Sequence, residues 1–132
     1  MLYLPDTNAC SHFFRGDPGL AARWADHIAA IRLSVVVLAE LRYGATKAAS
    51  TRQHQRIAAP VAAVPVEPLT ADDTEIYAEL RARLEKRGER IGSLDLFIAA
   101  QSIRLGATTV THNLREFRRV PGLRVEDWQT VP

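Results

Sequence analysis

The chain begins with the stretch Met1-Leu2-Tyr3-Leu4-Pro5-Asp6-Thr7-Asn8, and this stretch indicates how the rest of the fold is built. Tyr3-Leu4 is typical of the end of a short buried strand, which Pro5 cuts off because proline has no backbone N–H to donate. Asp6-Thr7-Asn8 are residue types preferred at helix N-caps, so a helix through residues 10–14 should begin there. The sequence therefore predicts a strand that passes directly into a helix through an acidic residue.

The remainder of the chain alternates between helical and β-rich patterns. The clearest helix start is Thr70, a hydroxyl cap followed by acids in the first turn. Leu20, Trp24 and Ile28 stand four residues apart and should line the inner face of the second helix. The other predicted segments are a second helix from 17, a strand at 31–36, a helix from 37, a weaker helix at 51–64 broken near Pro60, an extended piece at 64–66, a helix at 94–103, and strands at 107–111 and 123–125.

Short apolar strands that alternate with helices predict a parallel sheet covered by helices on both faces. With 132 residues and neither repeat nor linker, the chain should form one domain over residues 1–132. No run approaches the roughly 20 apolar residues of a membrane-spanning helix, and the first residues lack the basic region of a signal peptide. A single cysteine and 4 histidines argue against a disulfide framework or a structural zinc site. We expect a cytoplasmic α/β protein with no membrane segment.

The charges are nearly balanced, with 17 Lys and Arg against 15 Asp and Glu, so net charge alone does not indicate a nucleic acid partner. Their distribution is more informative, because basic residues gather within 81–90 and again within 115–124. Basic side chains beside acids suit a site that binds both a metal ion and a polyanion. The candidate RNA contacts are Arg81, Arg83, Arg87 and Arg90, and the alternative for each is an ordinary solvated helix face.

Acidic side chains fall where the predicted strands end, and in a parallel α/β sheet ligands collect at those carboxyl ends. Asp6 directly follows the first strand, and Glu40 lies about one turn into the helix after the second. Asn113 and Glu116 follow the last strand but one. Asp95 lies in the first turn of the helix before that strand, so it joins the others only if the chain bends back there. We therefore predict a cluster of carboxylates at one edge of the sheet.

Carboxylate oxygens are preferred ligands of Mg²⁺ and Mn²⁺. One such ion, or two about 3.5–4 Å apart, can activate water for phosphodiester hydrolysis, so the protein needs no nucleophile of its own. Three acids also have a simpler interpretation, namely Asp6 as a helix cap, Glu40 as a surface residue and Glu116 as an ion-pair partner. Asp95 stands among apolar residues, where an unpaired carboxylate is costly, and there the interpretation as a metal ligand is the stronger one.

Four segments together resemble the motifs of PIN-domain ribonucleases, and most closely those of the VapC toxins of toxin–antitoxin pairs. They span essentially the whole chain and are Leu4-Pro5-Asp6-Thr7-Asn8, Leu38-Ala39-Glu40-Leu41-Arg42-Tyr43-Gly44, Ile91-Gly92-Ser93-Leu94-Asp95-Leu96-Phe97-Ile98-Ala99-Ala100, and Val110-Thr111-His112-Asn113-Leu114-Arg115-Glu116-Phe117. The resemblance implies a PIN-like three-layer α/β/α fold with a short, mainly parallel sheet. It also implies an endoribonuclease dependent on Mg²⁺ or Mn²⁺ that cleaves structured RNA such as tRNA or rRNA. Such a protein would form a homodimer and be neutralised by a VapB-type antitoxin.

The resemblance also assigns roles by position. The fourth acid is Glu116 in the VapC-like pattern, whereas many PIN domains have an acid where Asn113 stands. We favour Glu116 as the acid and Asn113 as a supporting group or substrate contact. The remaining roles are metal ligand for Asp6, Glu40 and Asp95, and supporting polar group for Asn8 and Thr111.

The chain departs from the family pattern at two places that bear on the fold. Pro5 stands where an aliphatic strand residue is usual, and it removes one backbone donor. Val37 stands where a hydroxyl residue commonly caps the helix that carries Glu40, so that cap has to come from elsewhere or be absent.

Other functions share parts of this pattern. A haloacid-dehalogenase-type phosphatase also opens with a strand followed by aspartate, but it needs a second aspartate two residues later, where this chain has Asn8. A PIN-domain nuclease of RNA maturation and a catalytically silent RNA-binding PIN module are the alternatives to a toxin. A small upstream reading frame for a DNA-binding antitoxin would favour the toxin.

Overall fold

Short parallel strands form the centre of the protein in the computed structural model, which describes all 132 residues. Their order across the sheet is β3-β2-β1-β4-β5, in which a parallel bridge between Tyr3 and Ile31 joins the β2–β3 pair to β1. Every pairing is parallel. The strands are β1 (Tyr3–Pro5), β2 (Leu33–Ser34), β3 (Val66–Glu67), β4 (Thr108–Val110) and β5 (Arg124–Glu126).

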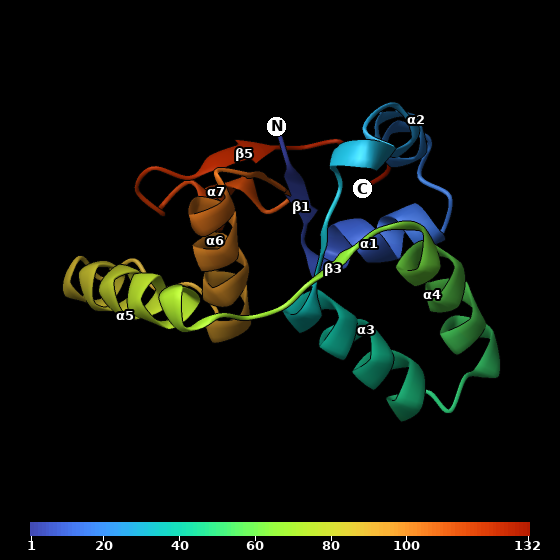
Figure 1. Ribbon diagram of the computed structural model, residues 1–132, viewed down its shortest axis with the longest axis horizontal. Helices are drawn as coiled ribbons and strands as arrows, with labels where there is room; N and C mark the ends of the chain where they lie inside the picture. Colours follow the sequence, from blue (N-terminus) through green and yellow to red (C-terminus); the bar gives the residue numbers. More distant parts are fainter.

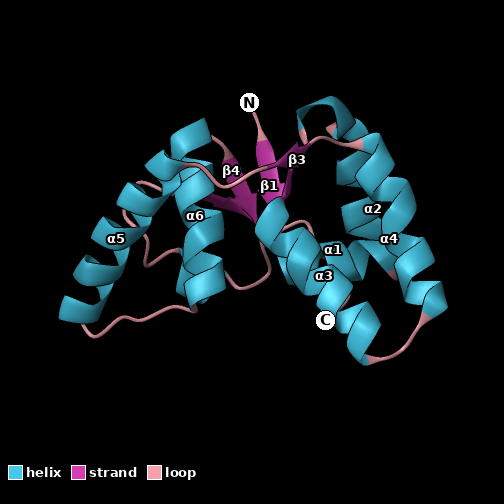
Figure 2. Cartoon of the chain, turned by 60° about the horizontal axis from the view of Figure 1, so that its bottom comes forward, coloured by secondary structure: helices cyan, strands magenta, loops and turns pink.

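Helices cover both faces of this sheet, with α1 to α4 on one side and α5 and α6 on the other (Figures 1 and 2). The predicted three-layer α/β/α architecture is therefore confirmed. None of the helices is both long enough and apolar enough to span a bilayer. The helices are α1 (Thr7–Phe14), α2 (Pro18–Asp26), α3 (Val35–Lys47), α4 (Thr51–Ala63), α5 (Ala71–Lys86), α6 (Ser93–Leu105) and α7 (Leu114–Phe117), with a short 3-10 helix, η1 (Ile28–Ala30), between α2 and β2.

Two hydrophobic clusters hold the layers together. The larger one joins α1 to α4 with the sheet and includes the fully buried Leu20, Val37 and Val110. The smaller one packs α5, α6 and α7 against each other through residues such as Leu84 and Phe117. Burial of this apolar surface holds the helices against the sheet.

The helix starts at Asp6, Asp17 and Thr70 are confirmed. Each of these side chains accepts a hydrogen bond from a backbone N–H in the first turn of its helix. At Thr70 the cap is reciprocal, because the Asp73 carboxylate also accepts from the Thr70 N–H at 2.8 Å. Such caps satisfy backbone donors that have no partner within the helix.

The predicted strand at 31–36 is wrong in its extent, because β2 covers only Leu33–Ser34 and α3 begins at Val35. Val35 and Val36 suggested that the strand continues, but packing against the sheet overrides this propensity. Ser34 provides the cap that Val37 cannot, since its hydroxyl accepts from the Val36 N–H at 3.1 Å. The helix that carries Glu40 is thus capped three residues earlier than the family pattern suggests.

Two further expectations are wrong for local reasons. Helix α4 is not broken at Pro60 but continues to Ala63. Pro60 lies in the last turn, so only one helical hydrogen bond is lost there. Ile28 does not face the core and is 42% exposed, because α2 ends at Asp26 and the chain turns away through η1.

Pro5 is the last residue of β1, so the strand ends where the sequence predicted, and Pro5 itself still pairs in register with Val110. The next residue, Asp6, donates its N–H to the Val110 carbonyl at 2.9 Å. Successive residues of a strand point to opposite edges, so the nitrogen of Pro5 faces the β2 side. Pairing on that side stops at the Tyr3–Ile31 bridge, after which the next donor position of β1 is Pro5.

Candidate active site

Four acids gather at the carboxyl edge of the sheet. Asp6 follows β1, Glu40 lies in the second turn of α3, Asp95 lies in the first turn of α6, and Glu116 lies in α7. The charges of Asp6, Glu40 and Glu116 each raise the pKa of Asp95, so these three carboxylates lie close enough to Asp95 to repel it. Helix α6 runs back along the sheet before it leads into β4 (Figure 1), which places its first turn at this edge. The chain therefore bends back as required, and Asp95 lies at the same edge of the sheet as the other acids.

Asp6 is both a helix cap and a member of this cluster. Its side chain is 4% exposed. One carboxylate oxygen, Oδ1, accepts from the Ala9 N–H at 2.8 Å, and the other, Oδ2, accepts from the Thr111 hydroxyl at 2.6 Å. Burial raises the pKa of Asp6 above its ordinary value, the two hydrogen bonds partly offset this, and the charges of Glu40 and Asp127 add to the rise. The helix cap at Asp6 is therefore confirmed, and its role as a metal ligand stays a prediction with which this geometry is compatible.

Thr111 reaches Asp6 because β1 and β4 run side by side. The register pairs Pro5 with Val110, so the next residue of each strand lies at the same level. The buried Thr111 hydroxyl accepts from the Asn113 N–H at 2.9 Å while it donates to Asp6. The expected supporting position of Thr111 thus has a definite geometry, which holds the Asp6 carboxylate in one orientation.

Glu40 is held by a residue that the sequence analysis treated only as a cap. The hydroxyl of Thr7, at the start of α1, donates to Glu40 Oε1 at 2.6 Å. Its position immediately after Asp6 was the available signal. Asn8, which was expected to support the acids, has an exposed side chain, and only its backbone carbonyl is engaged, by the His12 ring at 2.9 Å.

Asp95 is the least compensated of the four acids. Burial first, and then the charges of Asp6, Glu40 and Glu116, raise the pKa of Asp95 to about 6. No ion pair involves it. A carboxylate held among like charges without a cation is a common signature of a functional site.

The two candidates for the fourth position contact each other. The Asn113 side-chain amide donates to Glu116 Oε2 at 2.9 Å, so the amide orients the acid. The structure also adds an acid that the sequence analysis missed, Asp127, which follows β5, influences the pKa of Asp6 and contacts the His112 ring at 2.9 Å. Its place after a strand end was the signal that would have found it.

The donor chemistry of this cluster fits a hard divalent cation such as Mg²⁺ or Mn²⁺. Asp6, Glu40, Asp95 and Glu116 offer carboxylate oxygens, and none of them is paired with a Lys or Arg. As the side chains stand, no three of them are close enough to form a ready coordination shell. Mg²⁺ usually keeps several waters and needs only one or two carboxylates as direct ligands, so the acids can serve such a cation without forming a complete protein shell.

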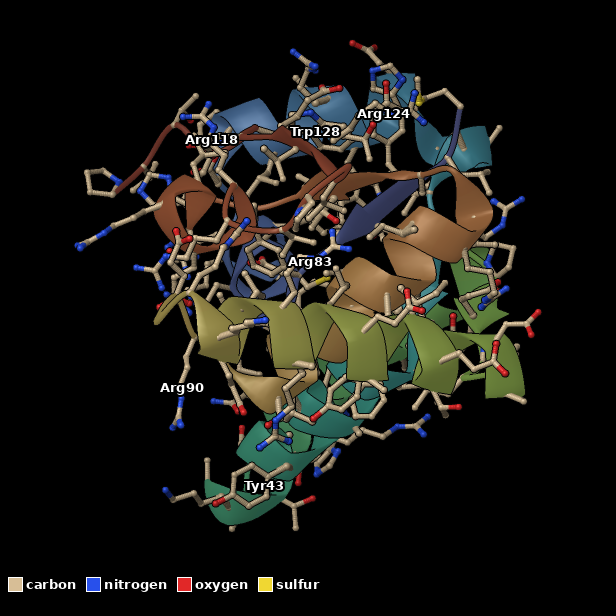
Figure 3. The ribbon with its side chains drawn as sticks, turned by 90° about the vertical axis from the view of Figure 1, so that its left-hand side faces the viewer. Tyr43, Arg83, Arg90, Arg118, Arg124 and Trp128 are labelled. Atoms are coloured by element: carbon tan, nitrogen blue, oxygen red, sulfur yellow. The ribbon has the colours of Figure 1, made fainter.

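The four arginines expected to contact RNA differ in their availability. Arg81 donates to Glu85 at 2.9 Å and to the Tyr77 hydroxyl at 2.9 Å. Arg87 pairs with Glu89 at 3.0 Å and also donates to a backbone carbonyl. Arg83 and Arg90 are exposed and form no ion pair, and Arg90 reaches outward beyond the end of α5 (Figure 3). Their contact with RNA stays a prediction.

Comparison with known proteins gives consistent similarities. Residues 3–123 match the PIN domain family. The chain is 36% identical to ribonuclease VapC2 of Rickettsia felis, over 97% of this chain and 98% of the relative. It is 30% identical to the tRNA(fMet)-specific endonuclease VapC of Salmonella typhimurium, over 96% of this chain and 97% of the relative.

Solved structures agree with these sequence similarities. A chain of VapBC2 from Rickettsia felis, bound to a DNA fragment from its promoter, superposes with a TM-score of 0.89 at 33% identity, covering 98% of this chain and 100% of that chain. A chain of DNA-bound VapBC from Salmonella typhimurium superposes with a TM-score of 0.86 at 32% identity, covering 97% of this chain and 99% of that chain.

Proposed function

The chain belongs to the PIN-domain family and, within it, to the VapC ribonucleases, and we propose that it is an endoribonuclease toxin that hydrolyses structured RNA. The observation that carries this proposal is the convergence of Asp6, Glu40, Asp95 and Glu116 without a cationic partner. Such a cluster is costly for the folded protein unless a cation binds there and offsets its negative charge.

The residues around the acids prepare this site by holding three of the four carboxylates in place. Thr111 and the Ala9 N–H fix the two oxygens of Asp6, at 2.6 and 2.8 Å. Thr7 fixes one oxygen of Glu40, and the Asn113 amide fixes one oxygen of Glu116. Asp95 is left without such a partner, so its carboxylate is the one most available for a ligand.

These four acids would hold the divalent cation, Mg²⁺ or Mn²⁺. When bound there, the cation supplies Lewis-acid chemistry, which lowers the pKa of water and offsets charge on the phosphodiester. The protein's own contribution is to fix the oxygen donors at one edge of the sheet and to exclude a competing lysine or arginine from the cluster. No side chain there needs to form a covalent intermediate.

The substrate and partners follow from the relatives. The Salmonella relative is named a tRNA(fMet)-specific endonuclease, so we take initiator tRNA as the first substrate to test, ahead of rRNA. The solved structures that resemble this chain are VapBC complexes, and this supports neutralisation of the chain by a VapB-type antitoxin. We also propose that the chain forms a homodimer.

The direct test is cleavage of purified initiator tRNA by the wild-type chain and by Asp6→Asn and Asp95→Asn, with Mg²⁺ or Mn²⁺ and with chelator. The wild type should cut at a defined position only when metal is present, and both variants should lose at least about a hundredfold in rate, as expected for removal of a principal electrostatic group. Circular dichroism would show that the variants are folded. Cleavage by both variants at the wild-type rate would rule out the proposed site.

The two alternatives are an RNA-maturation nuclease with the same catalytic residues and a catalytically silent PIN module. Mapping of RNA ends after expression of the chain alone separates both from a toxin. A toxin should arrest growth and cut a mature RNA, whereas a maturation enzyme should leave growth unchanged and remove precursor ends. A catalytically silent PIN module would give neither result.

A further inference from the structure

A groove of about 310 Å³ lies next to the acid cluster, between α1, α3 and α4. Glu40 and Thr7 line this groove and also belong to the cluster, so the two sites are continuous. The three helices lie on the same side of the sheet (Figure 1). A ligand that is bound at the acids and extends past Glu40 towards α4 therefore enters the groove.

Two arginines line this groove, and both are free to bind an anion. Arg15 follows the end of α1 and Arg56 lies on α4. Both are exposed, and neither takes part in any ion pair of the structure. Arg81 and Arg87, which the sequence pattern suggested as RNA contacts, are instead engaged with Glu85 and Glu89.

We propose that this groove binds the RNA strand on one side of the scissile phosphate, with Arg15 and Arg56 contacting its phosphates. The inference rests on the proposed function, because it assumes that the acids receive a phosphodiester. A phosphodiester within a chain is flanked by further phosphates, and the acids themselves repel those flanks. Two unpaired guanidinium groups supply the attraction that retains them, through charge-assisted hydrogen bonds. Arg15 and Arg56 are thus substrate-positioning residues.

The other lining residues suit a nucleic acid strand. Gln53 and Ser11 offer polar groups, while Phe14 and Ile57 provide apolar surface against which sugars and bases can pack. Gly44 lines the groove from α3, and a methyl group added there would meet nothing within 4 Å. The groove therefore has open space beside α3 that a larger side chain would fill.

RNA binding is measured with fluorescein-labelled initiator tRNA in an Asp6→Asn background, so that cleavage does not interfere. Arg15→Gln and Arg56→Gln should each weaken binding and lower the slope of log affinity against log salt by about 1. Arg52→Gln is the matched control, since Arg52 is an exposed arginine on the same helix that does not line the groove. Equal effects of all three substitutions would overturn the proposal, because they would reflect net charge alone.

A steric pair tests the same groove without changing charge. Gly44→Gln should raise the KM for RNA cleavage several-fold with little change in kcat, whereas Thr46→Gln, at an exposed position of the same helix that does not line the groove, should leave both close to wild type. Thermal unfolding of each variant would show that the fold is kept. If RNA binding is unchanged in Gly44→Gln and in both groove arginine variants while antitoxin binding is lost, the groove serves the protein partner and the proposal is wrong.

Failure of this inference differs from failure of the proposed function. If Asp6→Asn abolishes cleavage but the groove variants bind and cut like the wild type, only the groove assignment falls. If Asp6→Asn and Asp95→Asn still cut RNA, the assignment of the carboxylate site is wrong, independently of the results for the groove arginine variants.

Discussion

The hydroxyl of Thr111 donates a 2.6 Å hydrogen bond to Asp6 Oδ2, between residues that are 105 positions apart in the chain. It joins the ends of β1 and β4, two strands that pair in parallel at the centre of the sheet. Both side chains are buried. This contact favours the anionic form of Asp6 and partly offsets burial, which is the larger effect and raises the pKa of Asp6.

Thr111→Val should therefore lower RNA cleavage by about tenfold or more, because a hydrogen bond to a charged group contributes about 1.5–3 kcal/mol. The valine side chain has nearly the same shape, so little packing is lost. Thr111→Ser keeps the hydroxyl and should retain most of the activity. The measurement is kcat/KM at saturating Mg²⁺, and equal activity of the Val and Ser variants would show that the hydroxyl does not matter.

Asp95 should make the metal-free protein less stable as pH rises. Its pKa of about 6 in the folded chain lies above the value of about 4 for an unfolded aspartate, so the folded state binds the proton more tightly between these values. The stability contributed by this group is therefore full below about pH 4 and is lost as pH rises through about 6.

The test is chemical unfolding in chelator of the wild type and Asp95→Asn. At pH 7.5 the variant should be more stable by about 1–2 kcal/mol, allowing for solvent screening of a partly exposed group. The difference should shrink as pH falls from 6 towards 4. A constant difference across this range would contradict the assigned shift.

Arg104 should be important for stability although it lies away from the acid cluster. It contacts the buried Asp73 at 2.6 Å and Glu67 at 3.0 Å. Arg104→Met would leave the Asp73 carboxylate buried without a cation, which costs about 3–5 kcal/mol. Arg81→Met breaks only an exposed pair with Glu85 and should cost less than about 1 kcal/mol. Urea unfolding compares the two variants, and similar losses would refute the distinction.

Two helical glycines should respond oppositely to alanine. A methyl group at Gly44 meets nothing within 4 Å, so Gly44→Ala should stabilise α3 by about 0.5–1 kcal/mol. A methyl group at Gly19 would come within 2.5 Å of the Trp128 carbonyl, so Gly19→Ala should destabilise the chain by about 1–3 kcal/mol and loosen its C-terminal segment. Calorimetric unfolding would measure both, and a shift of the same sign for the two variants would contradict this difference.

Local patterns were enough for most elements of the fold. Asp6, Asp17 and Thr70 mark helix starts through their own side chains, and the alternation of strands and helices predicted the layered architecture. Local patterns failed where distant packing decided the outcome. The valines after Ser34 entered α3 because the sheet buries them there, and α4 continued through Pro60 because its last turn tolerates the loss of one hydrogen bond.

The sequence by itself determined the acidic residues and the kind of chemistry they suit, because residue type and position relative to strand ends are local properties. Only the tertiary structure decided how these acids are held. Thr7 reaches Glu40 and Thr111 reaches Asp6 through the packing of α1 on α3 and the pairing of β1 with β4. The same packing set two unpaired arginines beside Glu40, and no local pattern can report a contact between segments that only folding brings together.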